Sequence, residues 1–208
     1  MPTLHRWLPC ATLSLLIATA SAAQDSPRQL RQGLWLGVGF GVAHNDLQCT
    51  GCNTTGPEDP WNGGTGGSAY FAGGRALSQH VLAGIELGVS GTSGGGREAT
   101  LFNLLLVGHY YPSDEGSFYL KGGIGPATYS LSGLYQGQGG GVQASGWAGQ
   151  VGVGYDIRVR WRFALAPYAS VTGTTVRQRS IKVSGSGGSV TGLQNHVVTQ
   201  LGVALRRY

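Results

Sequence analysis

A stretch of strictly alternating side chains constrains the fold more than any other feature of this sequence. Residues 33–44 read G-L-W-L-G-V-G-F-G-V-A-H, so leucine, valine and phenylalanine occupy every second position. Because side chains along a β-strand point alternately to opposite faces, the apolar residues share one face, and glycine, alanine and Trp35 share the other. This pattern is typical of a strand with lipid on one side and a narrow, crowded lumen on the other.

The composition excludes an ordinary soluble domain. Charged residues make up 11% of the chain, against roughly 25% in soluble globular proteins. No run of 18 apolar residues occurs, so transmembrane helices are excluded as well. A closed β-barrel satisfies every backbone hydrogen bond between strands and spreads its apolar residues over every second position. We therefore expect an all-β fold.

The same alternation predicts eight strands and the links between them. The expected strands are 34–44, 68–77, 81–90, 99–110, 118–131, 146–157, 161–174 and 196–206, and the pattern does not assign the faces of the second. The links 78–80, 111–117 and 158–160 are short, whereas the links 45–67, 91–98, 132–145 and 175–195 are mostly longer and rich in Gly, Ser, Thr or Asn. Short and long links alternate in outer-membrane barrels, with periplasmic turns and external loops. We expect an eight-stranded antiparallel transmembrane β-barrel of up-and-down topology, with both termini in the periplasm.

The N-terminus reads as a cleaved signal peptide. His5 and Arg6 precede an apolar run at 13–20, and small residues at 20–23 form a cleavage site. The expected organisation is a signal peptide at 1–23, a short periplasmic segment at 24–33 and the barrel at 34–208. Trp147 and Tyr155 bracket the sixth strand as aromatic girdle residues. At the periplasmic rim we expect Tyr110, Tyr111, Phe118, Trp161 and Tyr208.

With these elements in place, the chain resembles the small eight-stranded outer-membrane barrels of the OmpA-barrel, OmpX and OmpW-like group. The resemblance lies in the first strand, the Y-Y-P turn at 110–112, the strand F-Y-L-K-G-G-I-G-P-A at 118–127, the stretch G-W-A-G-Q-V-G-V-G-Y-D-I at 146–157 and the strand ending on Tyr208. It implies a bacterial outer-membrane location, contact with outer-membrane lipid and lipopolysaccharide, and insertion by the barrel-assembly machinery, which reads a terminal aromatic residue.

Cys49 and Cys52 form C-T-G-C in the first external loop. In a secreted chain such a pair most simply forms a disulfide. Zinc binding lacks a second Cys or His pair nearby. Thioredoxin-like redox chemistry lacks the βαβ pattern that it needs. We predict a disulfide, with free or metal-bound thiols and redox chemistry as the alternatives.

Several polar residues fall on the inward face of the expected strands. Glu86, His109, Lys121 and Asp156 form the predicted lumen cluster, in which Glu86 and Lys121 could pair. Asn103, Gln150 and Arg162 are also expected inside. Charges there must be paired or hydrogen-bonded, because an unpaired buried charge is costly.

Four basic residues fall in the expected external loops: Arg97, Arg177, Arg179 and Lys182. Such residues could contact lipopolysaccharide phosphates, and a simply solvated loop is the equal alternative. No dense basic stripe with stacking aromatics points to nucleic acid. The glycine motifs at 37–41 and 149–154 lie on strands with no following helix, so they predict lumen packing and no nucleotide site.

These observations predict a non-enzymatic envelope or surface-interaction protein without a cofactor or metal. Its external ligand is not indicated. The alternatives are a narrow channel for small or apolar solutes, a lipid A-modifying enzyme and a soluble secreted barrel. Outer-membrane lipid A deacylases are similar in size and topology, but they carry a His and a Ser two residues apart. No H-x-S occurs in this sequence.

Overall fold

The computed structural model describes residues 31–49, 64–94, 97–114, 116–135, 138–160, 162–183, 186–190 and 194–208. Within this part of the chain, no helix is long and apolar enough to cross a membrane. The strands are β1 (Leu34–Cys49), β2 (Gly64–Ala76), β3 (Val81–Gly94), β4 (Arg97–Tyr110), β5 (Phe118–Tyr135), β6 (Gln138–Tyr155), β7 (Ile157–Arg160), β8 (Phe163–Val183), β9 (Ser186–Val190) and β10 (Gln194–Arg207).

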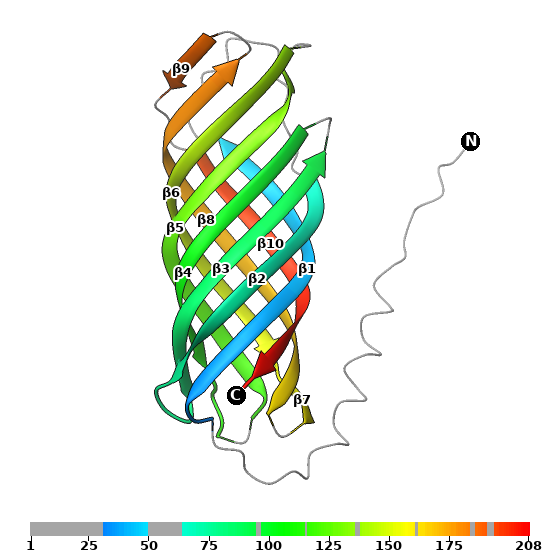
Figure 1. Cartoon of the computed structure of the whole chain (residues 1–208), viewed down its shortest axis with the longest axis vertical. Helices are drawn as coiled ribbons and strands as arrows, with labels where there is room; N and C mark the ends of the chain where they lie inside the picture. Colours follow the sequence, from blue (N-terminus) through cyan, green and yellow to red (C-terminus); the bar gives the residue numbers. More distant parts are fainter. Residues whose placement is uncertain are drawn as a thin grey trace, which may run out of the picture.

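Eight long strands close into one antiparallel barrel (Figure 1). Each pairs with the next along the chain, from β1 through β6 to β8 and β10. Closure comes from β10, where Leu201 lies opposite Ala169 of β8 and Val42 of β1. Two short strands extend the barrel ends, because β7 and β9 each pair with β8. The paired wall leaves no free edge among these eight strands, as a barrel in lipid requires.

Both ends of the described chain lie at the same end of the barrel, which we call the termini end. Arg31 and Tyr208 line one cavity there, and Figure 1 places the C-terminus at this end. The chain enters β1 through Gly33, whose φ of 85° is in the region that glycine adopts without steric cost. The carbonyl of Gly33 accepts a hydrogen bond from the Ala76 amide, which ties the start of β1 to the end of β2. The other end, with the β3–β4 and β5–β6 turns, is the hairpin end.

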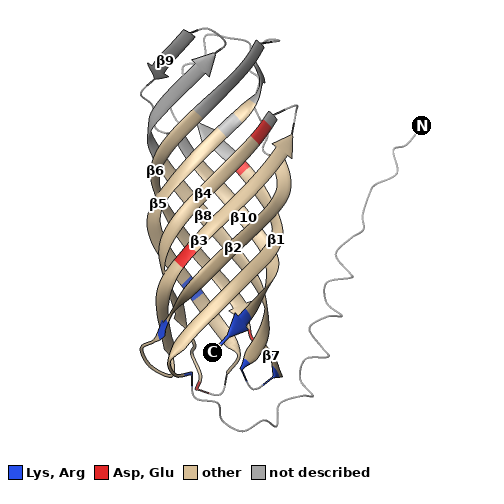
Figure 2. Ribbon diagram, in the orientation of Figure 1, with Lys and Arg blue, Asp and Glu red and all other residues tan. Residues whose placement is uncertain are grey.

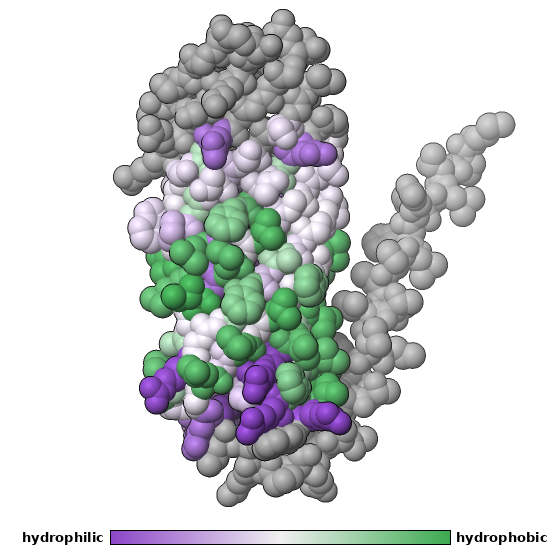
Figure 3. Space-filling view, in the orientation of Figure 1, coloured by the Kyte–Doolittle hydropathy of each residue, from purple (hydrophilic) through white to green (hydrophobic). Residues whose placement is uncertain are grey.

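The alternation places apolar side chains on the outside of the wall. Figure 3 shows the resulting hydrophobic band on one face of the barrel, with hydrophilic residues below it at the termini end and others above it toward the hairpin end. Large apolar residues exposed on this band include Leu36, Phe40, Phe71, Ile85, Leu106, Ile124, Trp147, Val151, Leu165 and Leu201. The band identifies the lipid-facing surface, since soluble proteins rarely expose so large a contiguous apolar patch. In β2, whose faces the sequence did not assign, Phe71 points outward and Tyr70 inward.

Inside the barrel, tyrosine rings lie over glycines of the neighbouring strand. Tyr70 is the register partner of Gly39, Tyr119 of Gly154 and Tyr168 of Gly202. A Cβ added at any of these glycines would overlap the tyrosine ring. The inward glycines therefore make room for large side chains and do not leave the lumen open.

The expected link positions are partly wrong. Segments 91–98 and 132–145 are mostly strand, because β3 and β4 meet at 94 and 97, and β5 and β6 meet at 135 and 138. Their Gly- and Ser-rich sequence carries no apolar period, yet a hairpin outside lipid needs only its backbone ladder. The predicted turn 158–160 is part of β7, and the turn follows it. Trp161 lies outside the described residues.

Candidate functional site

An ion pair occupies the middle of the lumen. Lys121 of β5 lies 2.7 Å from Oε1 and 2.6 Å from Oε2 of Glu86 on β3, and both side chains are buried. The ammonium group also lies 4.5 Å from the centre of the Tyr70 ring. The two residues come from strands separated by β4, so the pair spans part of the lumen.

A second polar network lies nearer the termini end and is centred on Arg206 of β10, which is 1% exposed. Its Nη1 donates to Asp156 Oδ1 at 3.4 Å and to the Tyr111 hydroxyl at 3.1 Å. Its Nη2 lies 3.4 Å from Nε2 of His109. The guanidinium also stacks 4.0 Å from the centre of the Tyr119 ring. The buried cation is thus matched by one carboxylate and by aromatic and hydroxyl groups, as a buried charge requires.

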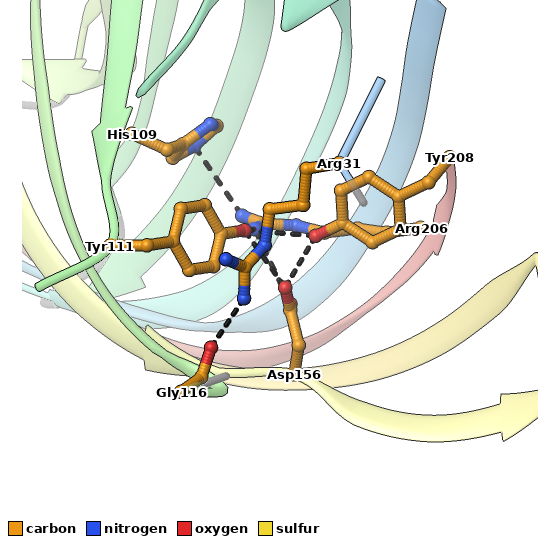
Figure 4. A network of polar contacts seen from close by, with 7 residues as sticks. All are labelled: Arg31, His109, Tyr111, Gly116, Asp156, Arg206 and Tyr208. Atoms are coloured by element: carbon orange, nitrogen blue, oxygen red, sulfur yellow. Dashed lines mark hydrogen bonds and ion pairs between the residues drawn. The ribbon is translucent and has the colours of Figure 1, made fainter. Parts of the chain in front are cut away.

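Two tyrosines and the N-terminal segment complete this network (Figure 4). The Tyr111 hydroxyl donates to Asp156 Oδ2 at 2.8 Å, and the Tyr208 hydroxyl donates to the same oxygen. Arg31 stacks 3.6 Å from the centre of the Tyr111 ring, and it donates to the carbonyls of Gln79 and Gly116 in two turns at the termini end. The two tyrosines and Arg31 therefore close the lumen at this end.

Burial sets the protonation of these two tyrosines. It raises the pKa of Tyr208 to about 12, and the negative charge of Asp156 acts in the same direction. Burial also raises the pKa of Tyr111, with the neighbouring Tyr208 as the next cause. Both hydroxyls therefore stay protonated at neutral pH and act as hydrogen-bond donors to the Asp156 carboxylate.

His109 lies inside the second network, next to Arg206. Its ring packs edge-on against Trp35 at 5.0 Å and against Tyr119 at 5.3 Å between centroids. Two aromatic rings and a guanidinium thus hold the imidazole at the inner boundary of the network, where it contacts groups from β1, β5 and β10.

The four residues of the predicted lumen cluster are all buried, but they fall into two groups. Glu86 and Lys121 form the central pair, whereas His109 and Asp156 meet through Arg206. Asn103 and Gln150 are buried as well, and Gln150 donates to Thr172 at 3.2 Å. Arg162 is exposed in the turn before β8, because that strand begins two residues later than predicted.

Sequence reasoning missed the residue that links this network. Arg206 alternates with Leu205, so the period of β10 places it inward with Ala204. Tyr111 and Tyr208, expected on the rim, point inward instead, while Tyr110 and Phe118 are exposed as predicted. Both inward tyrosines lie just beyond a strand end, where the two-residue period no longer determines direction.

The remaining candidates lie beyond the described part. Cys52 is outside the described residues, and only the backbone of Cys49 is described. The side chains of Arg97, Arg177, Arg179 and Lys182 are likewise not described. Among the described residues, no group of three or more His, Cys, Asp or Glu side chains is placed to hold a metal ion.

Comparison with known proteins identifies the fold. No protein-family profile and no curated protein sequence matches this chain. The outer membrane protein OprG from Pseudomonas aeruginosa is similar in structure, with a TM-score of 0.52 at 14% identity, over 87% of this chain and 99% of OprG. Ail, the attachment invasion locus protein of Yersinia pestis, gives 0.51 at 10% identity, over 84% and 99%. Neisserial surface protein A gives 0.51 at 13%, over 83% and 96%.

These likenesses and the closed ladder confirm the predicted fold class and the predicted resemblance at the level of architecture. The chain has the fold of the small, eight-stranded, integral outer-membrane β-barrels.

Proposed function

We propose that this protein is a non-enzymatic outer-membrane barrel that holds extended β-hairpins outside a bacterial cell for interaction. The single observation that carries the proposal is the filled and closed lumen. Tyr70, Tyr119 and Tyr168 occupy the space over the inward glycines, and the Arg206 network closes one end. The interior of an eight-stranded barrel is just wide enough for side chains to fill or for one small ligand, and here the tyrosine rings take that space.

Strand length supports a role outside the membrane. A tilted strand crosses the hydrocarbon core with about 9–11 residues. By contrast, β5 and β6 have 18 residues each and β8 has 21. The additional residues of these strands continue the backbone pairing beyond the apolar band, where the sequence is rich in Gly, Ser and Gln. These hairpins form a paired, water-facing platform for an external ligand.

Orientation follows from the ends of the barrel. At the hairpin end the first connection spans 50–63, and β5, β6 and β8 run for 18, 18 and 21 residues, so the chain extends well beyond the apolar band there even though the β3–β4 and β5–β6 turns are themselves tight. The termini end has connections at 77–80 and 111–117, directly below the band. Because outer-membrane barrels keep short turns in the periplasm, we place the termini end there and the hairpin end outside. Residues 1–23 are then the signal peptide, 24–33 the periplasmic segment and 34–208 the barrel inserted by the assembly machinery.

Two further assignments belong to the external face. We assign a disulfide to Cys49 and Cys52, and mass spectrometry of the unreduced protein tests it by counting free thiols. We assign lipopolysaccharide contact to Arg97, Arg177, Arg179 and Lys182, which the sequence places toward the hairpin end. Fold likeness does not assign function by itself, although one protein of this fold, Ail, is named for attachment and invasion.

Enzymatic activity is not part of this proposal. Asp156 accepts hydrogen bonds from two tyrosines and Arg206, and Glu86 is held by Lys121, so these carboxylates serve as structural partners of buried cations. The sequence also lacks the His-x-Ser pair of the deacylases. Comparing lipid A profiles with and without the gene tests this exclusion directly.

Planar-bilayer recording tests the filled lumen against the narrow-channel alternative. We expect no reproducible single-channel steps from the wild type. The triple variant Y70A/Y119A/Y168A, which removes three rings, should produce such steps and serves as the positive control. Steps of the same size from the wild type would overturn the closed-lumen proposal.

A shortened hairpin tests the external role. Leu131 and Val142 are register partners, so replacing residues 132–141 with Asn-Gly closes β5 and β6 by a two-residue turn. We expect normal heat-modifiable gel mobility but lost adherence of expressing cells to immobilised glycans and matrix proteins. Unchanged adherence, or none by wild-type cells, would contradict the proposal.

Epitope tags test the orientation of the barrel. A tag at 136–137 should be labelled on intact cells, and a tag after Arg160 should be labelled only on permeabilised cells.

A further inference from the structure

Basic residues gather around a hollow at the termini end of the barrel. Figure 2 shows blue residues concentrated around β7 and the C-terminal end of β10. A cavity of about 500 Å³ lies there, and its lining includes five arginines: Arg31, Arg158, Arg160, Arg162 and Arg207. The one acidic residue of the lining is Asp156, whose carboxylate already accepts hydrogen bonds from Arg206, Tyr111 and Tyr208. The lining therefore carries a clear excess of positive charge.

The five arginines do not have the same surroundings. Arg31 is buried and donates to two turn carbonyls, so it belongs to the closure of the lumen. Arg158, Arg160 and Arg207 are exposed at the mouth of the cavity. All three line the cavity with exposed side chains, so they bring cationic groups to this hollow. An anion that enters the hollow thus meets arginine donors suited to bidentate contact with phosphate oxygens.

Apolar side chains lie directly beside these cations. Arg207 of β10 is the register partner of Leu36 on β1 and of Phe163 on β8. Both partners line the cavity and are exposed, Leu36 by 47% and Phe163 by 39%, and Leu34 at its edge is 77% exposed. The hollow therefore joins a cationic mouth to the lower border of the lipid-facing band. A ligand that fits both parts has an anionic head and a hydrocarbon tail.

We propose that this hollow binds the headgroup of an anionic glycerophospholipid from the periplasmic leaflet. The lipid phosphate contacts Arg158, Arg160 and Arg207, and its acyl chains pack on Leu34, Leu36 and Phe163. The periplasmic source rests on the orientation given under Proposed function, whereas the binding chemistry does not. Bound lipid would hold the β7–β8 turn against β1 and β10 at the barrel seam.

Native mass spectrometry of the purified mature chain tests the site. The protein in detergent is titrated with phosphatidylglycerol, with phosphatidylcholine of the same acyl chains, or with inorganic phosphate. We expect one retained phosphatidylglycerol, weaker retention of phosphatidylcholine, and no displacement by millimolar phosphate. Equal retention of the two lipids would overturn the proposal. Displacement by free phosphate would overturn the lipid as the source of the anion.

Matched charge variants locate the site. R160Q and R207Q should each weaken phosphatidylglycerol retention about fivefold, the usual effect of one basic residue near an anionic lipid surface. R97Q is the control, because Arg97 begins β4 at the hairpin end, at the other end of the barrel from the cavity. An equal loss in R97Q would overturn the site. Heat-modifiable gel mobility shows whether each variant folds. If a variant does not fold, the preference of the wild type for phosphatidylglycerol over phosphatidylcholine still tests the proposal.

The two proposals fail in different ways. Lipid retention in detergent does not depend on which way the barrel faces, whereas tag labelling on intact cells does. Retained lipid together with an inverted tag pattern would keep the site and reject the orientation.

Discussion

Buried charge in this barrel is divided between two residue groups with different surroundings. Lys121 and Glu86 pair with each other beside the Tyr70 ring in the middle of the lumen. Arg206 is shared by Asp156, Tyr111 and His109. The first group is a simple pair and can be replaced as a unit. The second ties β4 and β10 to the junction between β6 and β7, so no single substitution removes it cleanly.

At the residue scale, we predict strong coupling between Glu86 and Lys121. E86L should lower the free energy of unfolding by about 3–5 kcal/mol, because it leaves the Lys121 ammonium buried without its counter-charge. The double variant E86L/K121M should regain most of this loss, since an apolar pair of similar size needs no partner. Urea titration in lipid vesicles, followed by tryptophan fluorescence, measures both. Additive losses in the double variant would show that the pair is not coupled.

At the scale of elements, the strands fit together through glycine and tyrosine at matched register positions. Tyr70, Tyr119 and Tyr168 each point inward over a glycine of a neighbouring strand, so the glycine on one strand makes room for the ring on the other. This matching also sets register, since a shift by one residue would turn every side chain to the other face. A valine opposite the ring would leave no room for it.

We predict that Gly39 and Tyr70 compensate for each other. G39V should destabilise the barrel by about 1–3 kcal/mol through overpacking against the Tyr70 ring. Adding Y70A should restore most of the stability, because it removes the ring that the new side chain meets. G149V is the matched control, since a Cβ at Gly149 meets nothing within 4 Å. The fraction of heat-modifiable protein across a urea series reports the effect, and failure of Y70A to rescue G39V would contradict the packing argument.

At the scale of the whole molecule, the outer surface is suited to lipid and not to water. Apolar side chains face outward over the band, and the described charged residues lie inside the barrel or beyond the band toward either end (Figures 2 and 3). This is the reverse of a soluble protein, and it follows from lipid being the outer solvent. The cost of an outward charge should therefore depend on its depth in the band.

We predict this depth dependence for two outward residues. I85R should cost about 2–4 kcal/mol, because Ile85 is central in the apolar run 81–89 of β3. L34R should cost about 0–1 kcal/mol, since Leu34 lies at the termini edge of the band, where an arginine reaches headgroups and water. Vesicle-based unfolding of both variants checks the difference. Equal costs would mean that the band does not lie in hydrocarbon.

The sequence by itself determined the all-β class, the eight strands and the side of the wall that most strand residues face. It could do so because a two-residue period is a local property that each strand carries alone. It placed Glu86 and Lys121 on inward faces for the same reason. Beyond the band the strands no longer alternate apolar and small side chains, so the sequence did not show that β5, β6 and β8 continue into long hairpins.

Only the tertiary structure decided which inward residues meet. Arg206 joins Asp156 and Tyr111 across 50 and 95 residues of chain, through the register of strands that are far apart in sequence. The direction of Tyr111 and Tyr208, past their strand ends, also depends on what lies across the barrel mouth. The arginine-lined hollow is assembled from β1, β7, β8 and β10, and it exists only because the last strand closes on the first.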